Sequence, residues 1–221
     1  MTWVKICGMT NLEDALVAVE AGADAVGFVF YEKSPRCVTV EMAREIVGKL
    51  PEKVEKVGVF VNEQEDKICS VVERSRITAV QMHGNNEDPH VADLVLKRRP
   101  QMKVLVAISM NHPNPQGWAM MWNGDVLQAF LVDSGNSLKH GGTGEAFDWR
   151  ARVPVVNEIK QLGNVVAAGG LRPENVREAI ETLRPWGVDV VSGVEASPGK
   201  KDPEKVRAFV RAVREMNRRV G

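Results

Sequence analysis

Eight apolar segments of strand length alternate with stretches whose apolar residues recur at helical spacing. The strand segments are residues 3–7, 25–30, 57–61, 78–82, 103–108, 129–132, 164–168 and 188–191. A helix is expected after each strand, although its pattern is weak around residues 118–121. Strands that alternate with helices indicate a parallel sheet with right-handed crossovers. Eight such units predict a (β/α)8 TIM barrel.

An open doubly wound sheet is the alternative architecture for this pattern. That fold would favour a GxGxxG fingerprint after the first strand, and the turn after Cys7 lacks one. A chain of 221 residues can form one large core and is short for two typical domains. Residues 1–221 are therefore expected to form a single barrel domain.

Side-chain caps are predicted where several of the helices begin. Thr10 and Glu13 have the spacing of a capping box, and Asn62 and Glu65 repeat it. Pro173 suits the first turn of the seventh helix.

Charge and composition bear on partners and on the compartment. The 29 basic and 29 acidic residues cancel, which indicates neither a nucleic-acid nor a membrane partner. No apolar run approaches the roughly 20 residues that a membrane span needs, and the N-terminus has no signal-peptide pattern. Three cysteines do not suggest a disulfide framework, so a cytoplasmic location is expected.

Three chemically able side chains follow strands that are far apart in the sequence. Cys7, His83 and Asp133 stand at or directly after the ends of the first, fourth and sixth strands. In a (β/α)8 barrel the carboxyl ends of the strands form the active site, so these groups should converge. Cys7 could instead be a small buried hydrophobe, and His83 a structural histidine with satisfied hydrogen bonds.

Glycines follow the last two strands, at Gly169–Gly170 and within Ser192–Gly193–Val194–Glu195. Glycine lets backbone N–H groups approach an anion, and the loops after strands seven and eight commonly bind phosphate in this fold. The alternative is that these glycines only serve tight turns. A further stretch, Gly141–Gly144, lacks the Lys-Ser/Thr ending of a P-loop and is interpreted as a mobile lid.

Arg36 follows Ser34-Pro35 just after the second strand, where its guanidinium could grip a carboxylate or could simply lie at the surface. No metal site is predicted. Of the four histidines only His83 ends a strand, and the cysteines lack CxxC spacing.

These motifs together resemble the phosphoribosylanthranilate isomerases of tryptophan biosynthesis. The resemblance runs through nearly the whole chain and rests on Lys5–Gly8, Gly22–Phe28, Ser34–Arg36, Val57–Val61, Gln81–Gly84, Leu131–Asp133, Gly141–Gly144, Phe147–Trp149, Ala167–Leu171, Gly187–Asp189 and Ser192–Glu195.

The resemblance implies an Amadori rearrangement of N-(5′-phosphoribosyl)anthranilate, a small phosphosugar, with no cofactor. It assigns the general base to Cys7 and the general acid to Asp133. Arg36 would hold the anthranilate carboxylate, with His83 as a further binding residue. The phosphate would bind at Gly169, Gly170, Ser192, Gly193, Val194 and Glu195. Lys5 either supplies positive potential to Cys7 or pairs with Asp189 inside the barrel.

Two other functions remain open at this point. One is a metal-dependent pentose-phosphate epimerase, and the other is a non-catalytic phosphate binder on the same fold. A pure binder has no need for an acid and a base on separate strands. The oligomeric state is expected to be a monomer or a homodimer.

Overall fold

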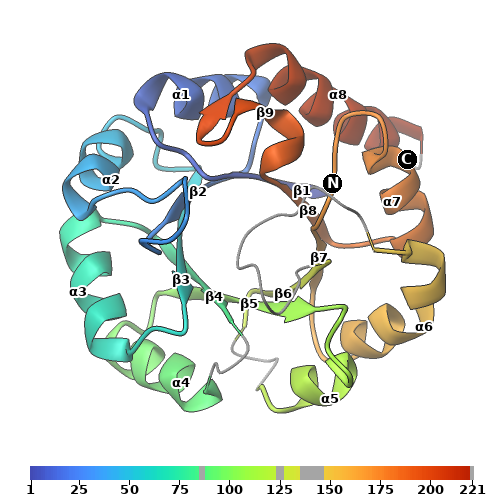
Figure 1. The fold of residues 1–221 in the computed structure, drawn as a ribbon, viewed down its shortest axis with the longest axis horizontal. Coiled ribbons are helices and arrows are strands. Elements are labelled where there is room, and N and C mark those ends of the chain that lie inside the picture. The colour runs from blue at the N-terminus through green and yellow to red at the C-terminus, as the bar shows by residue number, and fades with distance from the viewer. Residues whose placement is uncertain (85–87, 123–126, 135–146, 220–221) are drawn as a thin grey trace.

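The computed structural model describes residues 1–84, 88–122, 127–134 and 147–219. Eight parallel strands close into a barrel in chain order (Figure 1). They are β1 (Trp3–Cys7), β2 (Ala25–Val29), β3 (Glu55–Val61), β4 (Ala79–His83), β5 (Lys103–Ser109), β6 (Ala129–Asp133), β7 (Val165–Ala167) and β8 (Gly187–Val190). The predicted (β/α)8 barrel is confirmed, and the open doubly wound sheet is wrong because β1 pairs with β8.

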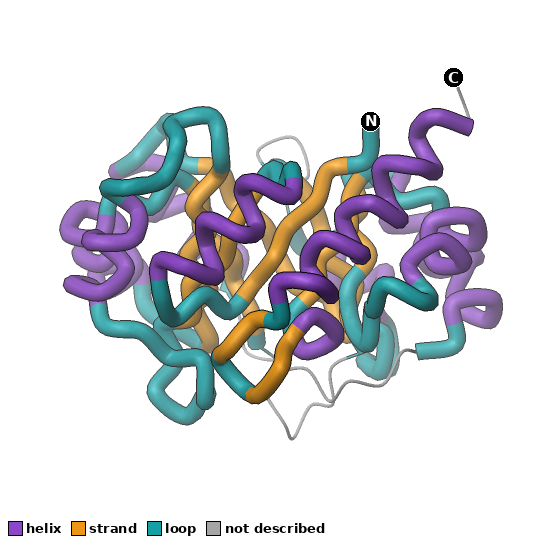
Figure 2. The backbone as a smooth tube through the Cα atoms, turned by 90° about the horizontal axis from the view of Figure 1, so that it is seen from above, coloured by secondary structure: helices purple, strands orange, loops and turns teal. Residues whose placement is uncertain are grey.

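The helices form a ring around the strands, which Figure 2 shows from the side. In the described part of the chain they are α1 (Leu12–Ala21), α2 (Val40–Val47), α3 (Glu65–Ser75), α4 (Pro89–Arg98), α5 (Pro115–Met120), α6 (Trp149–Lys160), α7 (Val176–Leu183) and α8 (Pro203–Arg219). The weakly patterned fifth helix therefore exists, as a short one.

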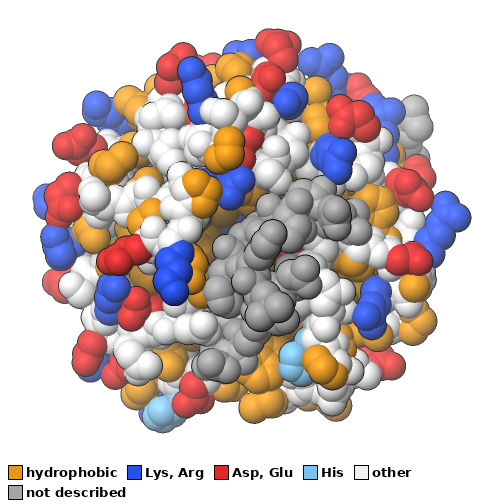
Figure 3. All heavy atoms as spheres, viewed as in Figure 1, with side chains coloured by type: hydrophobic (Ala, Val, Ile, Leu, Met, Phe, Trp, Pro, Cys, Tyr) orange, Lys and Arg blue, Asp and Glu red, His pale blue; other side chains and the backbone are white. Residues whose placement is uncertain are grey.

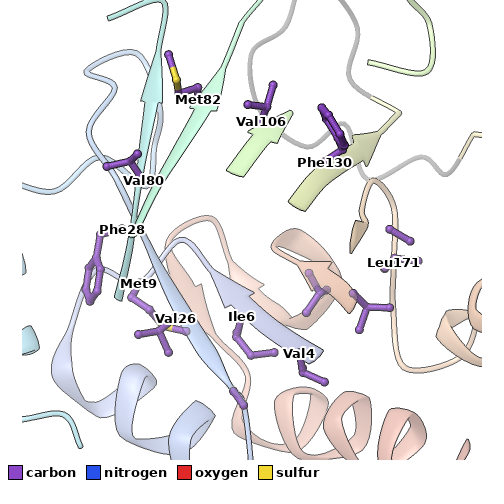
Figure 4. Close-up of a cluster of buried hydrophobic side chains, with 14 of the residues drawn as sticks. Val4, Ile6, Met9, Val26, Phe28, Val80, Met82, Val106, Phe130 and Leu171 are labelled. Carbon is purple, nitrogen blue, oxygen red and sulfur yellow. The ribbon is translucent and has the colours of Figure 1, made fainter. Parts of the chain in front are cut away.

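Side chains alternate along β1, so the strand serves two different layers. Val4 and Ile6 belong to the large apolar layer between strands and helices (Figure 4). Lys5 and Cys7 lie on the opposite face: Lys5 bonds Asp189 of β8 inside the barrel, and Cys7 lines a hollow at the end of β1. Trp3 belongs to a separate interior cluster with small apolar residues of the other strands. The interior is therefore apolar at the level of Trp3 and polar at the carboxyl end of β1.

The helix caps differ from those predicted. Asn11, not Thr10, caps α1, because the Asn11 side chain accepts from the backbone N–H of Asp14. The Thr10 hydroxyl instead donates to the backbone oxygen of Gly199 at 2.5 Å. Gln64 precedes α3 without a side-chain cap, so the expected cap by Asn62 is wrong.

The segment after β8 forms a structure that its pattern did not predict. Ser192–Val194 is a single 3₁₀ turn, η2, and β9 (Glu195–Ser197) pairs with β10 (Lys200–Lys201) in a small antiparallel hairpin. Pro173 also lies before α7 and not in its first turn, since α7 begins at Val176. The hairpin brings Glu195 and Lys201 next to the end of the barrel.

Acidic and basic side chains are interspersed around the face seen in Figure 3 and do not gather into a patch of one sign. This agrees with the zero formal net charge of the chain. Within the described ranges, every helix is too short or too polar to cross a membrane.

Candidate active site

A hollow at the carboxyl ends of the strands brings together four of the residues predicted from the sequence. It is open to solvent and is lined by Cys7, Arg36, His83 and Asp133. The other polar side chains that line it are Tyr31, Ser34, Gln81 and Asp189. Its apolar walls are formed by Val29, Val59, Val61, Leu131 and Val191. The groups predicted to converge therefore share one site.

An ion pair forms the floor of this site. Lys5 and Asp189 are opposite each other in the β1–β8 register, and Lys5 Nζ lies 3.0 Å from Asp189 Oδ2. Lys5 also donates to Gln81 Oε1 at 2.7 Å. Burial alone would lower the pKa of Lys5, but the neighbouring Asp189 and Cys7 outweigh it and raise that pKa. The predicted pairing of Lys5 with Asp189 is confirmed, and Lys5 stays charged beneath Cys7.

Cys7 lies above this pair and is almost fully buried, with 4% of its surface exposed. Burial raises the pKa of the thiol above its ordinary value, Asp189 adds to the increase, and Lys5 and Lys201 oppose it. Gly27 is its register partner on β2, where a Cβ atom would lie 2.5 Å from the sulfur. The Cys7 thiol therefore fits here because residue 27 is a glycine, and any side chain at that position would clash with the sulfur.

Asp133 ends β6, with β7 and β8 between it and β1 in the closed order. The Ser134 hydroxyl lies 3.4 Å from Asp133 Oδ1. Gly169, with φ +78°, approaches so closely that a Cβ there would lie 2.5 Å from the same carboxylate oxygen. Asp133 and Cys7 therefore face the hollow from separate sides, as an acid and a base acting on one ligand would require.

Arg36 is held by a second buried ion pair. Its Nε and Nη2 atoms donate to the two carboxylate oxygens of Glu195 at 2.8 and 2.7 Å. This fork-to-fork geometry fixes the plane of the guanidinium. Arg36 is 8% exposed and lines the hollow, which excludes the alternative of a plain surface arginine.

The glycine turns after β7 and β8 border a smaller hollow that adjoins the first. Gly169, Gly170 and Ser192 line it together with Asp133 and Asp189. Gly169 and Gly170 have φ of +78° and +65°, a conformation that favours glycine. A Cβ at Gly193 would lie 1.9 Å from the Leu171 backbone oxygen, so glycine allows these two turns to pack together.

Three predicted binding residues stand back from these two hollows. Gly193 packs against the turn after β7, and Val194 is fully buried behind it. The Glu195 carboxylate contacts Arg36 and Lys201. The predicted lid at Gly141–Gly144 lies outside the described residues.

Three polar residues in or beside the site were not assigned a role in binding or catalysis from the sequence. Asp189 was expected only as a partner of Lys5, yet its Oδ1 atom is buried without a hydrogen bond to any described residue. Gln81 lines the hollow and bonds Lys5. Lys201 belongs to a two-residue strand, which carries almost no sequence pattern. The alternation along the fourth strand, which puts Gln81 on the inward face beside His83, was the one available signal.

Among the described residues, no three side chains of His, Cys, Asp or Glu gather in a way that could hold a metal ion. What the site does assemble is a thiol, a carboxylic acid, a fixed arginine and glycine turns. Fold and site together define the class of this protein as a (β/α)8-barrel enzyme for acid–base chemistry on an anionic ligand.

Comparison with known proteins identifies the family. A family model described as N-(5'phosphoribosyl)anthranilate (PRA) isomerase matches residues 4–212. A protein of Geobacter sp. (strain M21), named N-(5'-phosphoribosyl)anthranilate isomerase, is 45% identical over 217 residues, which cover 98% of this chain and 100% of that protein. The enzyme of the same name from Thermotoga maritima is 44% identical over 96% of this chain and 98% of its own.

Solved structures agree with this identification. The crystal structure of phosphoribosyl anthranilate isomerase from Thermotoga maritima matches with a TM-score of 0.86 and 42% identity, over 97% of this chain and 100% of that one. A phosphoribosyl anthranilate isomerase in complex with reduced 1-(o-carboxyphenylamino)-1-deoxyribulose 5-phosphate matches with a TM-score of 0.83, 41% identity and the same coverage. The chain belongs to the N-(5'-phosphoribosyl)anthranilate isomerase family. The isomerase predicted from the sequence is thereby confirmed.

Proposed function

We propose that the hollow catalyses the Amadori rearrangement of N-(5′-phosphoribosyl)anthranilate to 1-(2-carboxyphenylamino)-1-deoxyribulose 5-phosphate, a step of tryptophan biosynthesis. The observation that carries the proposal is the meeting of Cys7, Asp133 and Arg36, from three separate segments, around one hollow. Family membership supports the choice of substrate. We further propose that residues 1–221 act as one domain.

Ring opening and proton removal at C2′ each need a proton transfer, and one group is placed for each of these steps. The ribose ring opens when an acid protonates the ring oxygen, and Asp133 is the acid in this proposal. A base then removes the proton from C2′, and Cys7 as its thiolate is that base. The resulting enolamine takes up a proton at C1′ while its C2′ hydroxyl gives one up, and it becomes the aminoketose. Only protons move, so the proposed chemistry calls for no metal and no redox cofactor.

Binding of the substrate involves both of its ends. Arg36 has a guanidinium of fixed orientation at the rim of the hollow and would bind the anthranilate carboxylate. The phosphate would bind at the glycine turns, through Gly169, Gly170 and Ser192, which line the smaller hollow. Glu195 contributes by orienting Arg36. His83 lines the hollow as a further binding residue.

The groups around Cys7 act on its thiolate form in opposite directions. Burial disfavours the thiolate, and the buried ammonium of Lys5 partly compensates. Asp189 presents an oxygen without a hydrogen bond to described residues, which makes it a suitable acceptor for a ligand hydroxyl or amine.

We propose a cytoplasmic enzyme that works as a monomer or a homodimer. A structural relative is described as mutually generated monomers of a dimeric phosphoribosylanthranilate isomerase from Thermotoga maritima. The balanced charge of this chain is consistent with a small-molecule substrate and with no nucleic-acid or membrane partner.

The direct test is turnover of freshly prepared N-(5′-phosphoribosyl)anthranilate by the purified protein, followed by loss of substrate fluorescence in the presence of EDTA. We expect turnover that EDTA does not reduce. A folded protein that leaves the substrate unchanged, or an activity that EDTA abolishes, would contradict the proposal.

A further inference from the structure

One buried carboxylate, that of Glu195, is shared by two buried cations. Its oxygens accept from Arg36 at 2.8 and 2.7 Å and from Lys201 Nζ at 3.0 Å. The backbone N–H of Gly199 approaches the same Oε1 atom at 3.3 Å. The side chains of Lys201 and Glu195 are 0% and 5% exposed, so solvent screens these charges little.

The hairpin of β9 and β10 holds Lys201 rigidly. The Lys201 backbone N–H donates to Asp14 Oδ2 at 2.7 Å, and its Nζ also donates to the Val191 backbone oxygen at 3.2 Å. Thr10 bonds the same hairpin at Gly199. Burial lowers the pKa of Lys201, and the Glu195 carboxylate opposes that change. Lys201 is therefore anchored at both its backbone and its side chain.

The charges of this cluster do not cancel. Arg36 and Glu195 alone would form a neutral pair. In such a pair Glu195 would compensate the charge of Arg36 before a ligand binds. Adding Lys201 gives two positive charges to one negative charge. The neighbouring pair of Lys5 and Asp189 is neutral, so of these two buried ion-pair groups only the Arg36–Glu195–Lys201 cluster carries a net positive charge.

We propose that Lys201 is a positioning residue of this enzyme. Because it shares the Glu195 carboxylate with Arg36, the charge of Arg36 is only partly compensated and can attract a second anion. The positive charge of Lys201 also favours the thiolate form of Cys7. This rests on the proposed roles of Arg36 and Cys7. Lys201 itself does not line the hollow, so it acts through these two groups and not by touching the substrate.

The groups that surround Cys7 determine how the thiol should respond. Lys5 faces it from its own strand and Asp189 from β8, while Lys201 and Arg36 approach from the hairpin and from the segment after β2. His83, Asp133 and Gln81 line the same hollow from β4 and β6. Lys201 carries a positive charge and its partner Glu195 a negative one. Neutralising Lys201 and neutralising Glu195 therefore change the charge near the thiol in opposite directions.

The test uses K201M, E195Q and the double variant K201M/E195Q, with K205M as a matched control. Lys205 lies on the next helix, α8, contacts the Glu195 backbone oxygen and is 49% exposed at its side chain. The rate of Cys7 alkylation by iodoacetamide is measured against pH by peptide mass spectrometry, which separates Cys7 from Cys37 and Cys69. The KM for phosphoribosylanthranilate is measured in parallel.

K201M should slow Cys7 alkylation about threefold or more at a fixed pH below the thiol pKa, and E195Q should accelerate it, since one charge changes in each case. The double variant should fall between them, and K205M should match the unmodified protein. K201M should also raise the KM about tenfold, because Glu195 then compensates the charge of Arg36 alone and Arg36 attracts the substrate carboxylate less strongly.

Slowing of alkylation by both K201M and E195Q would identify general damage to the site and overturn the proposal. The absence of any change at Lys201, in alkylation and in KM, would overturn it as well. Alkylation is read without turnover. If K201M slows Cys7 alkylation and E195Q accelerates it, but the protein does not turn over its substrate, the charge cluster is supported and the proposed reaction is refuted.

Discussion

Lys5 and Asp189 are the two ends of an ion pair that crosses from β1 to β8 inside the barrel, with 3.0 Å between Nζ and Oδ2. Neither side chain is more than 5% exposed. One oxygen of Asp189 is thus committed to the pair, while the other has no described partner. This arrangement places a fixed, buried dipole directly below the thiol of Cys7.

The first prediction concerns this pair. Replacing Lys5 by Met leaves the Asp189 charge buried and uncompensated, so K5M should lower the free energy of unfolding by about 3–5 kcal/mol. The double variant K5M/D189N removes the stranded charge and should lose less than K5M alone. Urea unfolding followed by circular dichroism measures both.

An exposed ion pair provides the control. Arg74 and Glu41 are paired at 2.5 Å, but their side chains are 58% and 67% exposed. R74A should therefore change the free energy of unfolding by less than about 1 kcal/mol. Equal losses for K5M and R74A would contradict the importance of burial.

The second prediction concerns Arg36. R36A removes the fork that faces the hollow and should raise the KM for phosphoribosylanthranilate about 10- to 100-fold, with a smaller effect on kcat. R36K keeps the charge but not the planar fork, so it should lie between R36A and the unmodified enzyme. Steady-state kinetics measure kcat and KM for both variants. A fall in kcat at constant KM would contradict the proposal that Arg36 binds the substrate carboxylate.

The third prediction uses two glycines of positive φ. At Gly169, φ is +78° and a Cβ would meet Asp133 Oδ1 and the Ser134 backbone at 2.5 Å. At Gly22, φ is +99° and the nearest atom to a Cβ is Val210 Cγ1 at 3.7 Å. G22A should cost about 1–2 kcal/mol of stability from backbone strain. G169A should cost more, because its Cβ also clashes with its neighbours.

Only the change at Gly169 should also reach the chemistry. G169A displaces Asp133 and should lower kcat at least about tenfold, since a small misplacement of a catalytic group is costly. G22A should leave kcat within about a factor of two, because α1 ends far from any reacting atom. Stability by thermal unfolding and kcat by fluorescence separate the two effects, and a normal kcat for G169A would contradict the close approach described.

Much of the fold and part of the site could be predicted from the sequence. The barrel followed from eight apolar strand segments that alternate with helical patterns, because such units build a parallel sheet with helices outside it. The convergence of Cys7, His83 and Asp133 followed from the common edge of parallel strands. Both features depend on local pattern and on topology.

The Arg36–Glu195–Lys201 cluster could not be predicted in the same way. Arg36 and Glu195 are 159 positions apart, and their contact depends on a hairpin of two- and three-residue strands with no hydrophobic period. The cap of α1 was misassigned for a related reason, since Thr10 is engaged by Gly199 from the other end of the chain. Contacts of this kind are set by tertiary structure and leave little local signal.

The fourth prediction is a pH dependence of stability through Glu195. Burial opposes its charged form, but the hydrogen bonds from Arg36 and the nearby Lys201 outweigh burial and lower its pKa below the ordinary value of 4.5. At acid pH the unfolded chain then binds a proton more readily than the folded one. The stability that Glu195 contributes is present above pH 4.5 and is lost as the pH falls toward its folded pKa.

Urea unfolding between pH 6 and pH 3 tests this sign. E195Q has no proton to bind at this position, so its free energy of unfolding should decline less steeply below about pH 4.5 than that of the unmodified protein. Exposed carboxylates are common to both proteins and cancel in the comparison. Parallel acid limbs would contradict the assignment of the shift to Glu195.

The central claim is that Cys7 and Asp133 are the base and the acid of one isomerisation. The most direct measurement is kcat for phosphoribosylanthranilate in C7A and in D133A, each with its fold verified by circular dichroism. We predict that either change lowers kcat by about 10²–10⁴-fold, the usual contribution of general acid–base catalysis. A folded C7A or D133A variant that turns over substrate at close to the unmodified rate would contradict the account.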